Sequence, residues 1–125
     1  MTLILDAGAL IAIDRDNKDV VALIKRERLA GREPVTHGAI VGQVWRNGSR
    51  QANLARALAG IQVVPLDQNL GRRAGLLLRA SGTSDVVDAA LVLLASDGDE
   101  IMTSDGNDIA VLAEASDLFV EVLVV

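Results

Sequence analysis

The feature that most constrains the fold is a regular alternation between short apolar runs and longer segments with helical pattern. Several of the runs are rich in β-branched residues, and they are too short for buried helices, so they are predicted to be strands. No tight hairpin signal joins one run directly to the next. Strands separated by helices predict an α/β fold with a mostly parallel sheet. The predicted strands are Met1–Leu5, Pro34–Thr36, Ile61–Leu66, Ile101–Thr103 and Leu118–Val125.

The intervening segments carry the signals of helix ends. Asp16-Asn17 and Asp67 are suitable N-caps, and Gly31 and Gly60 follow the expected ends of two helices. The expected helices are Ala9–Ile13, Lys18–Ala30, His37–Trp45, Ser49–Ala59, Asp67–Ala80, Thr83–Ala95 and Asp105–Ala115. The expected buried stripe of the second helix is Val21, Leu23, Ile24 and Leu29.

The size and composition of the chain favour one globular domain in a reducing compartment. The 125 residues are predicted to form a single domain, residues 1–125, with an aliphatic core, since half of them are hydrophobic. There is no cysteine, so disulfides and thiolate metal sites are excluded. Asp6 interrupts the apolar N-terminus, which argues against a secretory signal, and no apolar stretch is long enough to span a bilayer. A cytoplasmic location is expected, with no membrane partner.

The net charge of −5 hides a strong asymmetry along the chain. Residues 1–79 hold all 12 Lys and Arg with 7 of the 17 acids, whereas residues 80–125 hold the other 10 acids and no base. This separation predicts an acidic site built largely by the last third of the chain. It also predicts a basic flank that could receive an anion.

Five aspartates are the candidate ligands of that acidic site: Asp6, Asp85, Asp88, Asp105 and Asp108. Asp6 and Asp105 follow predicted strands, and sites in parallel sheets form at the carboxyl ends of strands. Asp88 lies in an apolar helical segment, where a carboxylate is costly unless it is paired or bound to a metal. Converging carboxylates favour a hard divalent cation such as Mg²⁺ or Mn²⁺. The alternative for Asp85 and Asp105 is simple helix capping.

Motifs spread over the whole chain resemble the PIN domain family, in its VapC-like branch. They are Leu3–Ala12 (LILDAGALIA), Val44–Arg46 (VWR), Ser84–Ala89 (SDVVDA) and Thr103–Asp105 (TSD) with Asp108-Ile109. The resemblance implies a three-layer α/β/α fold. It further implies a Mg²⁺- or Mn²⁺-dependent endoribonuclease that acts as the toxin of a VapBC toxin–antitoxin pair. RNA such as tRNA or rRNA would be the substrate, a VapB-like antitoxin the partner, and a homodimer the assembly.

The resemblance also implies roles for individual residues. Asp6, Asp88 and Asp105 match the catalytic, metal-binding acids of the family, and Asp108 and Asp85 match accessory ligands. The family places a Glu before the Trp-Arg pair, but this chain has Gln43. Gln43 is assigned to the catalytic set as a neutral replacement, which is expected to weaken cation binding. It also keeps a second hypothesis open, that of a PIN-like binding module without catalysis.

Two arginines and the single histidine are further candidates for a functional role. Arg46 and Arg50, four residues apart near Gln43, are the best candidates for contact with nucleic acid or antitoxin. His37, the only histidine, is expected to start a helix rather than to act in catalysis.

Two other α/β folds with acidic sites fit the sequence less well. A response-regulator receiver would need an acid pair after the first strand and a late Lys. A haloacid-dehalogenase-type phosphatase would need a second acid at the position of Gly8, so both readings are disfavoured.

Overall fold

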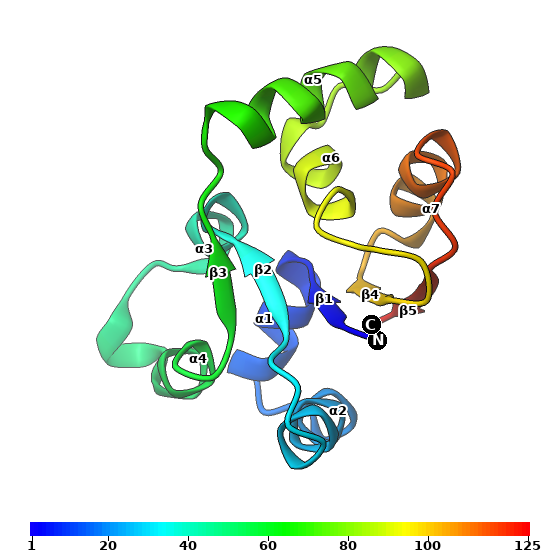
Figure 1. Ribbon diagram of the computed structural model, residues 1–125. Coiled ribbons are helices and arrows are strands. Elements are labelled where there is room, and N and C mark those ends of the chain that lie inside the picture. The colour runs from blue at the N-terminus through cyan, green and yellow to red at the C-terminus, as the bar shows by residue number, and fades with distance from the viewer.

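A computed structural model describes all 125 residues as one α/β/α sandwich (Figure 1). Five short parallel strands form its central sheet, and seven α-helices and one 3₁₀ helix connect them. The strands are β1 (Leu3–Leu5), β2 (Val35–His37), β3 (Gln62–Val64), β4 (Glu100–Thr103) and β5 (Glu121–Val124). The helices are α1 (Ala7–Asp14), α2 (Lys18–Leu29), α3 (Gly38–Val44), η1 (Gly48–Arg50), α4 (Ala52–Leu58), α5 (Gln68–Ser81), α6 (Val86–Val92) and α7 (Gly106–Ala115).

The order of the strands in the sheet is β3-β2-β1-β4-β5, and every pairing is parallel. β1 and β4 lie at the centre and are buried along their whole length. Helix α1 packs against α2, α3 and α4, whereas α5, α6 and α7 pack against one another. The two groups of helices lie to different sides of the sheet (Figure 1). The α/β class and the mostly parallel sheet are therefore confirmed.

The core is aliphatic, as the composition predicts, and its largest buried side chains come from the two central strands and from α1, α3, α4, α6 and α7. In α2, however, the predicted buried stripe is partly wrong. Val21, Leu23 and Ile24 are half-buried and Leu29 is 84% exposed, while Glu27 is fully buried. None of the helices is both long and apolar enough to cross a lipid bilayer.

Two helices are shorter than the sequence pattern predicts, because side-chain contacts and tight turns set their ends. The helix predicted over residues 49–59 begins only at Ala52, since Gln51 accepts hydrogen bonds from the Arg46 and Asn47 amides and holds an irregular connection. The helix predicted over residues 83–95 spans only Val86–Val92. Its start is set by the cap at Asp85, and its end tightens into turns in which Leu94 and Ala95 bond the carbonyls three residues back.

Candidate active site at the carboxyl ends of the strands

Asp6 is buried where the central strand β1 passes into α1. It is the N-cap of α1, and its Oδ1 accepts a hydrogen bond of 2.7 Å from the Ala7 amide. Its Oδ2 accepts a second bond, of 2.6 Å, from the Thr103 hydroxyl at the end of β4. Only 3% of the residue is exposed. Hydrogen bonds to both oxygens fix the orientation of this carboxylate before any ligand arrives.

A row of side chains crosses the sheet at the level of Asp6. β1 and β4 pair Leu5 with Met102, so the next residues, Asp6 and Thr103, are neighbours. On the other side, β1 and β2 pair Ile4 with Val35, and the same register two residues on brings Asp6 beside His37. Ligand sites of open parallel sheets form at this edge. The row places a histidine and a threonine on either side of the first acid.

Asp85 and Asp88 occupy the first turn of α6. Asp85 is the N-cap, and its Oδ1 accepts the Asp88 amide at 3.0 Å, so the capping alternative for this residue is confirmed. The Asp88 side chain is partly exposed and makes no hydrogen bond or ion pair. The buried face of α6 begins directly after it, at Ala89. Asp88 is thus a free carboxylate in the first turn of α6, directly before its buried part.

Asp105 and Asp108 lie at the start of α7. Asp105 holds the N-cap position, but its side chain makes no capping bond, so the capping alternative is wrong for this carboxylate. The preceding loop approaches α1 closely, because a Cβ built on Gly8 would lie 2.6 Å from the Ser104 Oγ. Gly8 therefore allows the loop that carries Asp105 to sit against the helix that Asp6 caps.

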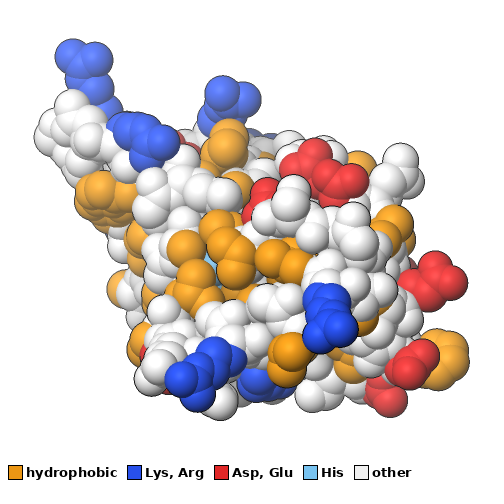
Figure 2. Space-filling model, turned by 90° about the horizontal axis from the view of Figure 1, so that it is seen from above, with side chains coloured by type: hydrophobic (Ala, Val, Ile, Leu, Met, Phe, Trp, Pro, Cys, Tyr) orange, Lys and Arg blue, Asp and Glu red, His pale blue; other side chains and the backbone are white.

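The acids are close enough to change the pKa of Asp88. Partial burial raises this pKa first, and the negative charges of Asp6, Asp85, Asp105 and Asp108 raise it further, to about 7. All five carboxylates predicted from the sequence therefore lie in one electrostatic cluster, here called the acid cluster. Asp85, Asp88 and Asp108 also line a small cavity of about 190 Å³. On the face of the molecule toward which the strands point, acidic side chains gather beside a hydrophobic patch (Figure 2).

The donor chemistry of the acid cluster fits a hard divalent cation, since it offers only carboxylate and hydroxyl oxygens around mutually repelling charges. The present side-chain positions do not place three acidic or histidine side chains around one point that could hold a metal ion. Asp6 and Asp85 are held by hydrogen bonds, whereas Asp88, Asp105 and Asp108 have unbonded carboxylates. These three side chains would therefore be free to turn toward a cation beside Asp6, whose own carboxylate is held in place.

Gln43 and the two predicted arginines lie on the segment that follows β2. Gln43 is exposed in the last turn of α3, and its amide makes no hydrogen bond within the chain. Arg46 donates through Nη1 to the Gly42 and Trp45 carbonyls and so completes the end of α3. Arg50 is exposed in η1. The two arginines therefore lie in separate structural units and not on one helical face.

Sequence reasoning missed the position of His37. The residue is the N-cap of α3, as expected of a helix start, but its side chain makes no capping bond. It is fully buried, with Nε2 3.0 Å from the Val87 carbonyl oxygen, one residue before Asp88. The signal was available, because a lone histidine directly after a predicted strand shares the level of Asp6 in a parallel sheet.

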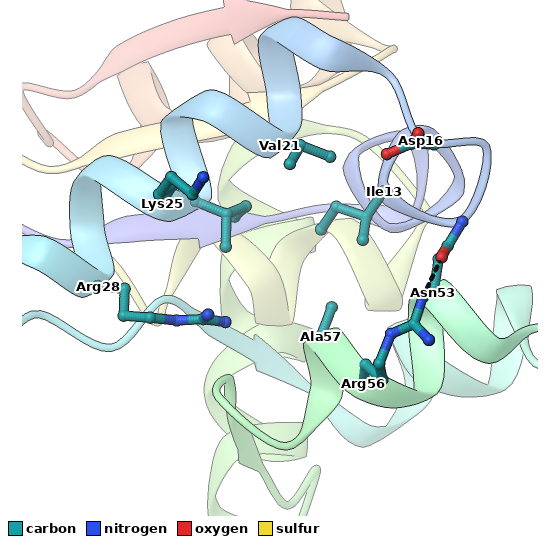
Figure 3. A pocket seen from close by; sticks show the side chains of 9 residues that line it. Ile13, Asp16, Val21, Lys25, Arg28, Asn53, Arg56 and Ala57 are labelled. Carbon is teal, nitrogen blue, oxygen red and sulfur yellow. Dashed lines mark hydrogen bonds between the residues drawn. The ribbon is translucent and has the colours of Figure 1, made fainter.

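A basic pocket lies apart from the acid cluster, between α2, α4 and the end of α1 (Figure 3). It has a volume of about 290 Å³ and an apolar floor that includes Ile13 and Ala57. Lys25, Arg28 and Arg56 line it, and Arg56 donates a hydrogen bond to Asn53. Part of the basic flank expected from the charge asymmetry is thus gathered at one pocket.

Known proteins include a similar fold, but the family models and curated sequences include none that matches this chain. No protein-family model and no curated protein sequence matches the chain. Among solved structures, the chain is similar to VapBC2 from Rickettsia felis bound to a DNA fragment from the promoter of its genes. The TM-score is 0.68 at 11% identity, and the match covers 98% of both chains. The fold is shared with a chain of a VapBC complex.

This likeness confirms the three-layer PIN-like fold that the motifs implied. At 11% identity it shows the fold alone, so the activity has to be argued from the acid cluster.

Proposed function

We propose that the protein is a Mg²⁺- or Mn²⁺-dependent endoribonuclease, the toxin of a VapBC-type toxin–antitoxin pair. The observation that carries the proposal is the acid cluster. At the carboxyl ends of β1 and β4, Asp88 lies close enough to four other carboxylates for their charges to raise its pKa, and no Lys or Arg neutralises it. A carboxylate whose pKa is as strongly shifted as that of Asp88 is typical of a functional site.

Each acid has a distinct part in the proposed site. Asp6 is the fixed ligand, because both of its oxygens are already oriented by hydrogen bonds. Asp88 and Asp105 are the mobile ligands that complete the set, with Asp108 and Asp85 as accessory groups. A bound divalent cation supplies a Lewis acid and an activated water for hydrolysis of a phosphodiester. Gln43 offers a neutral amide oxygen from the end of α3.

The charge distribution suits an anionic substrate and a protein partner. Arg50 is exposed on the segment that follows α3, where it could contact RNA phosphates. The similar structure is a VapBC complex on promoter DNA, which supports an antitoxin as the partner of this chain. In the proposed function the protein acts in the cytoplasm as a homodimer that the antitoxin holds inactive.

The decisive experiment is cleavage of labelled structured RNA by the purified, antitoxin-free protein. The reaction is run with EDTA, Mg²⁺ and Mn²⁺, beside Asp88→Asn. We expect metal-dependent cutting that falls by at least ~100-fold in the variant, since a cation site loses a charged ligand. Glu114→Gln is the matched control, because it removes one exposed carboxylate at the far end of α7. Equal cutting by both variants would refute the assignment of Asp88.

A non-catalytic binding module is the second candidate function. Two observations favour it, the neutral Gln43 in place of an acid and the lack of three side chains around one point. Calorimetry with Mg²⁺ and Mn²⁺ separates the two functions before any RNA is chosen. Absence of both metal binding and cutting supports the binding module, whereas metal binding in the micromolar to millimolar range supports the nuclease.

A further inference from the structure

The hydrogen bond between His37 and Val87 fixes the tautomer of the only histidine in the chain. Its Nε2 lies 3.0 Å from the Val87 carbonyl oxygen, and a carbonyl only accepts. Nε2 therefore carries the proton. Burial, the largest effect, lowers the pKa of His37 against the smaller opposing effects of this bond and of the Asp6 charge. The imidazole is then neutral at pH 8, and Nδ1 keeps its lone pair.

This Nδ1 is a buried acceptor without a partner. It is the one buried side-chain nitrogen or oxygen in the molecule that makes no hydrogen bond. Buried polar atoms are nearly always hydrogen-bonded, and each exception calls for an explanation, such as a functional role or an unseen donor. A phenylalanine or leucine would fill the same space without this penalty. The lone pair is therefore a feature to be explained rather than a by-product of packing.

The surroundings of His37 point to the acid cluster. The strand register places it beside Asp6 at the carboxyl ends of β2 and β1. Its proton is bound by the carbonyl of the peptide that joins Val87 to Asp88. One imidazole thus lies beside the fixed acid and holds the backbone next to the mobile acid. Partners of this kind orient the ligands of metal sites and tune their affinity.

We propose that His37 is a positioning residue of the acid cluster. Its Nε2 proton holds the Val87–Asp88 peptide against β2, and its Nδ1 lone pair accepts a hydrogen bond from a water molecule of the hydrated cation. The proposal rests on the proposed function, since it assigns His37 a place beside the divalent cation of that site. The competing explanation is a passive strut between β2 and α6, in which Nδ1 stays unpartnered with or without cation.

Nuclear magnetic resonance of the imidazole nitrogens tests the proposal directly, because one histidine gives a single pair of side-chain signals. The ¹⁵N-labelled protein is titrated with Mg²⁺ at pH 8. We expect a protonated Nε2 and an unprotonated Nδ1 before titration. The Nδ1 signal should then move in step with Mg²⁺ binding measured by calorimetry, while Nε2 stays protonated. In Asp88→Asn the Nδ1 signal should move only at much higher Mg²⁺ concentrations.

His37→Gln separates the two halves of the proposal. The amide nitrogen of Gln can still donate to Val87, but an amide oxygen on a flexible side chain of different shape replaces the fixed Nδ1 acceptor. We expect Mg²⁺ affinity to fall on the order of tenfold, as is usual when an outer partner of a metal site is removed. The midpoint of thermal unfolding of the metal-free protein should stay close to that of the parent. A passive strut predicts no change in Mg²⁺ affinity in this variant.

The outcomes distinguish this inference from the proposed function. Mg²⁺ binding with a stationary Nδ1 signal overturns the role of His37 and leaves the nuclease proposal standing. A protonated Nδ1 at pH 8 overturns the role as well, since the acceptor would not exist. Absence of Mg²⁺ and Mn²⁺ binding overturns both. Binding with a moving Nδ1 signal supports the inference even if no RNA that is tried is cut.

Discussion

Two carboxylates near opposite ends of the central strand β4 have pKa values that are shifted in opposite directions. Glu27 lies near the start of β4 and is fully buried, with Oε2 2.6 Å from Arg32 Nε and Oε1 3.0 Å from Arg26 Nη2. Arg26 also reaches Glu100, the first residue of β4. Burial alone would raise the pKa of Glu27, yet the hydrogen bonds and charges of Arg32 and Arg26 lower it overall. The two arginines therefore favour the charged form of this carboxylate, and each of its oxygens has a hydrogen-bond partner.

Asp88 lies near the other end of β4 and is less buried, but it has only acidic neighbours. Its pKa rises to about 7 where that of Glu27 falls. Burial acts to raise the pKa of both carboxylates, and the charge of the neighbours decides whether that rise is reversed, as at Glu27, or extended, as at Asp88. Around Glu27 the chain supplies the compensating cations itself. Around Asp88 it supplies no cation, which is the property expected of a binding site.

The largest effect on stability is expected from removing the negative charge of Glu27, which Arg26 and Arg32 share. Glu27→Gln keeps the shape of the side chain but leaves Arg26 and Arg32 without their shared anion. Loss of one partner of a buried pair costs ~3–5 kcal/mol, and since both arginines are about 40% exposed we expect ~2–3 kcal/mol. Urea unfolding at pH 7 measures the change. Glu33→Gln, an exposed site a few residues on, should change the free energy of unfolding by less than ~0.5 kcal/mol.

In the acid cluster of the metal-free protein, removing a carboxylate is expected to raise the free energy of unfolding rather than lower it. The folded-state pKa of Asp88 lies above the ordinary value of 3.8, so its contribution to stability is present at low pH and is lost as pH rises toward 7. Asp88→Asn removes this loss. We expect the variant to be more stable than the parent at pH 8 by ~1–2 kcal/mol, a figure reduced for partial exposure, and to differ little near pH 4.

Urea unfolding of both proteins at pH 4 and pH 8 in EDTA measures this difference. Saturating Mg²⁺ should reverse the order at pH 8, because the parent gains binding energy that the variant lacks. A parent that is more stable than the variant at pH 8 in EDTA would mean that Asp88 is compensated within the chain, as Glu27 is.

The comparison also shows what the sequence could and could not predict. Asp67 and Asn17 were identified as caps because a cap is a local contact, and both cap as predicted. Four of the acids lie in two pairs three residues apart, each at a helix start, so spacing alone indicated that the members of each pair are neighbours. The strand order that joins these pairs to Asp6 is a long-range property, which local pattern does not encode.

Glu27 and His37 were missed for the same physical reason. A charged residue in a basic stretch of helix is normally solvated, and nothing local shows that Arg32, beyond the end of α2, folds back onto Glu27. His37 was assigned to a helix start because Gly38–Val44 is helical. Its role depends on the distant Val87 carbonyl, 50 residues away along the chain. The structure adds the residues that have a partner outside their own helix or strand, such as Arg32 for Glu27 and Val87 for His37.

The smallest expected effect comes from adding a charge to the acid cluster rather than removing one. Gln43→Glu restores an acid at the end of α3, where the PIN-like motif pattern has one. If Gln43 borders the cation, the added charge should tighten Mg²⁺ binding by ~3–10-fold, because an exposed charge near a divalent ion contributes on the order of 1 kcal/mol. The metal-free protein should lose a little stability, since a sixth acid joins five that already repel one another.

Gln62→Glu is the control for this prediction, because on the exposed side of β3 it makes the same charge change outside the acid cluster. Equal Mg²⁺ affinity in the two variants would remove Gln43 from the site, and the acid cluster would then consist of the five aspartates alone.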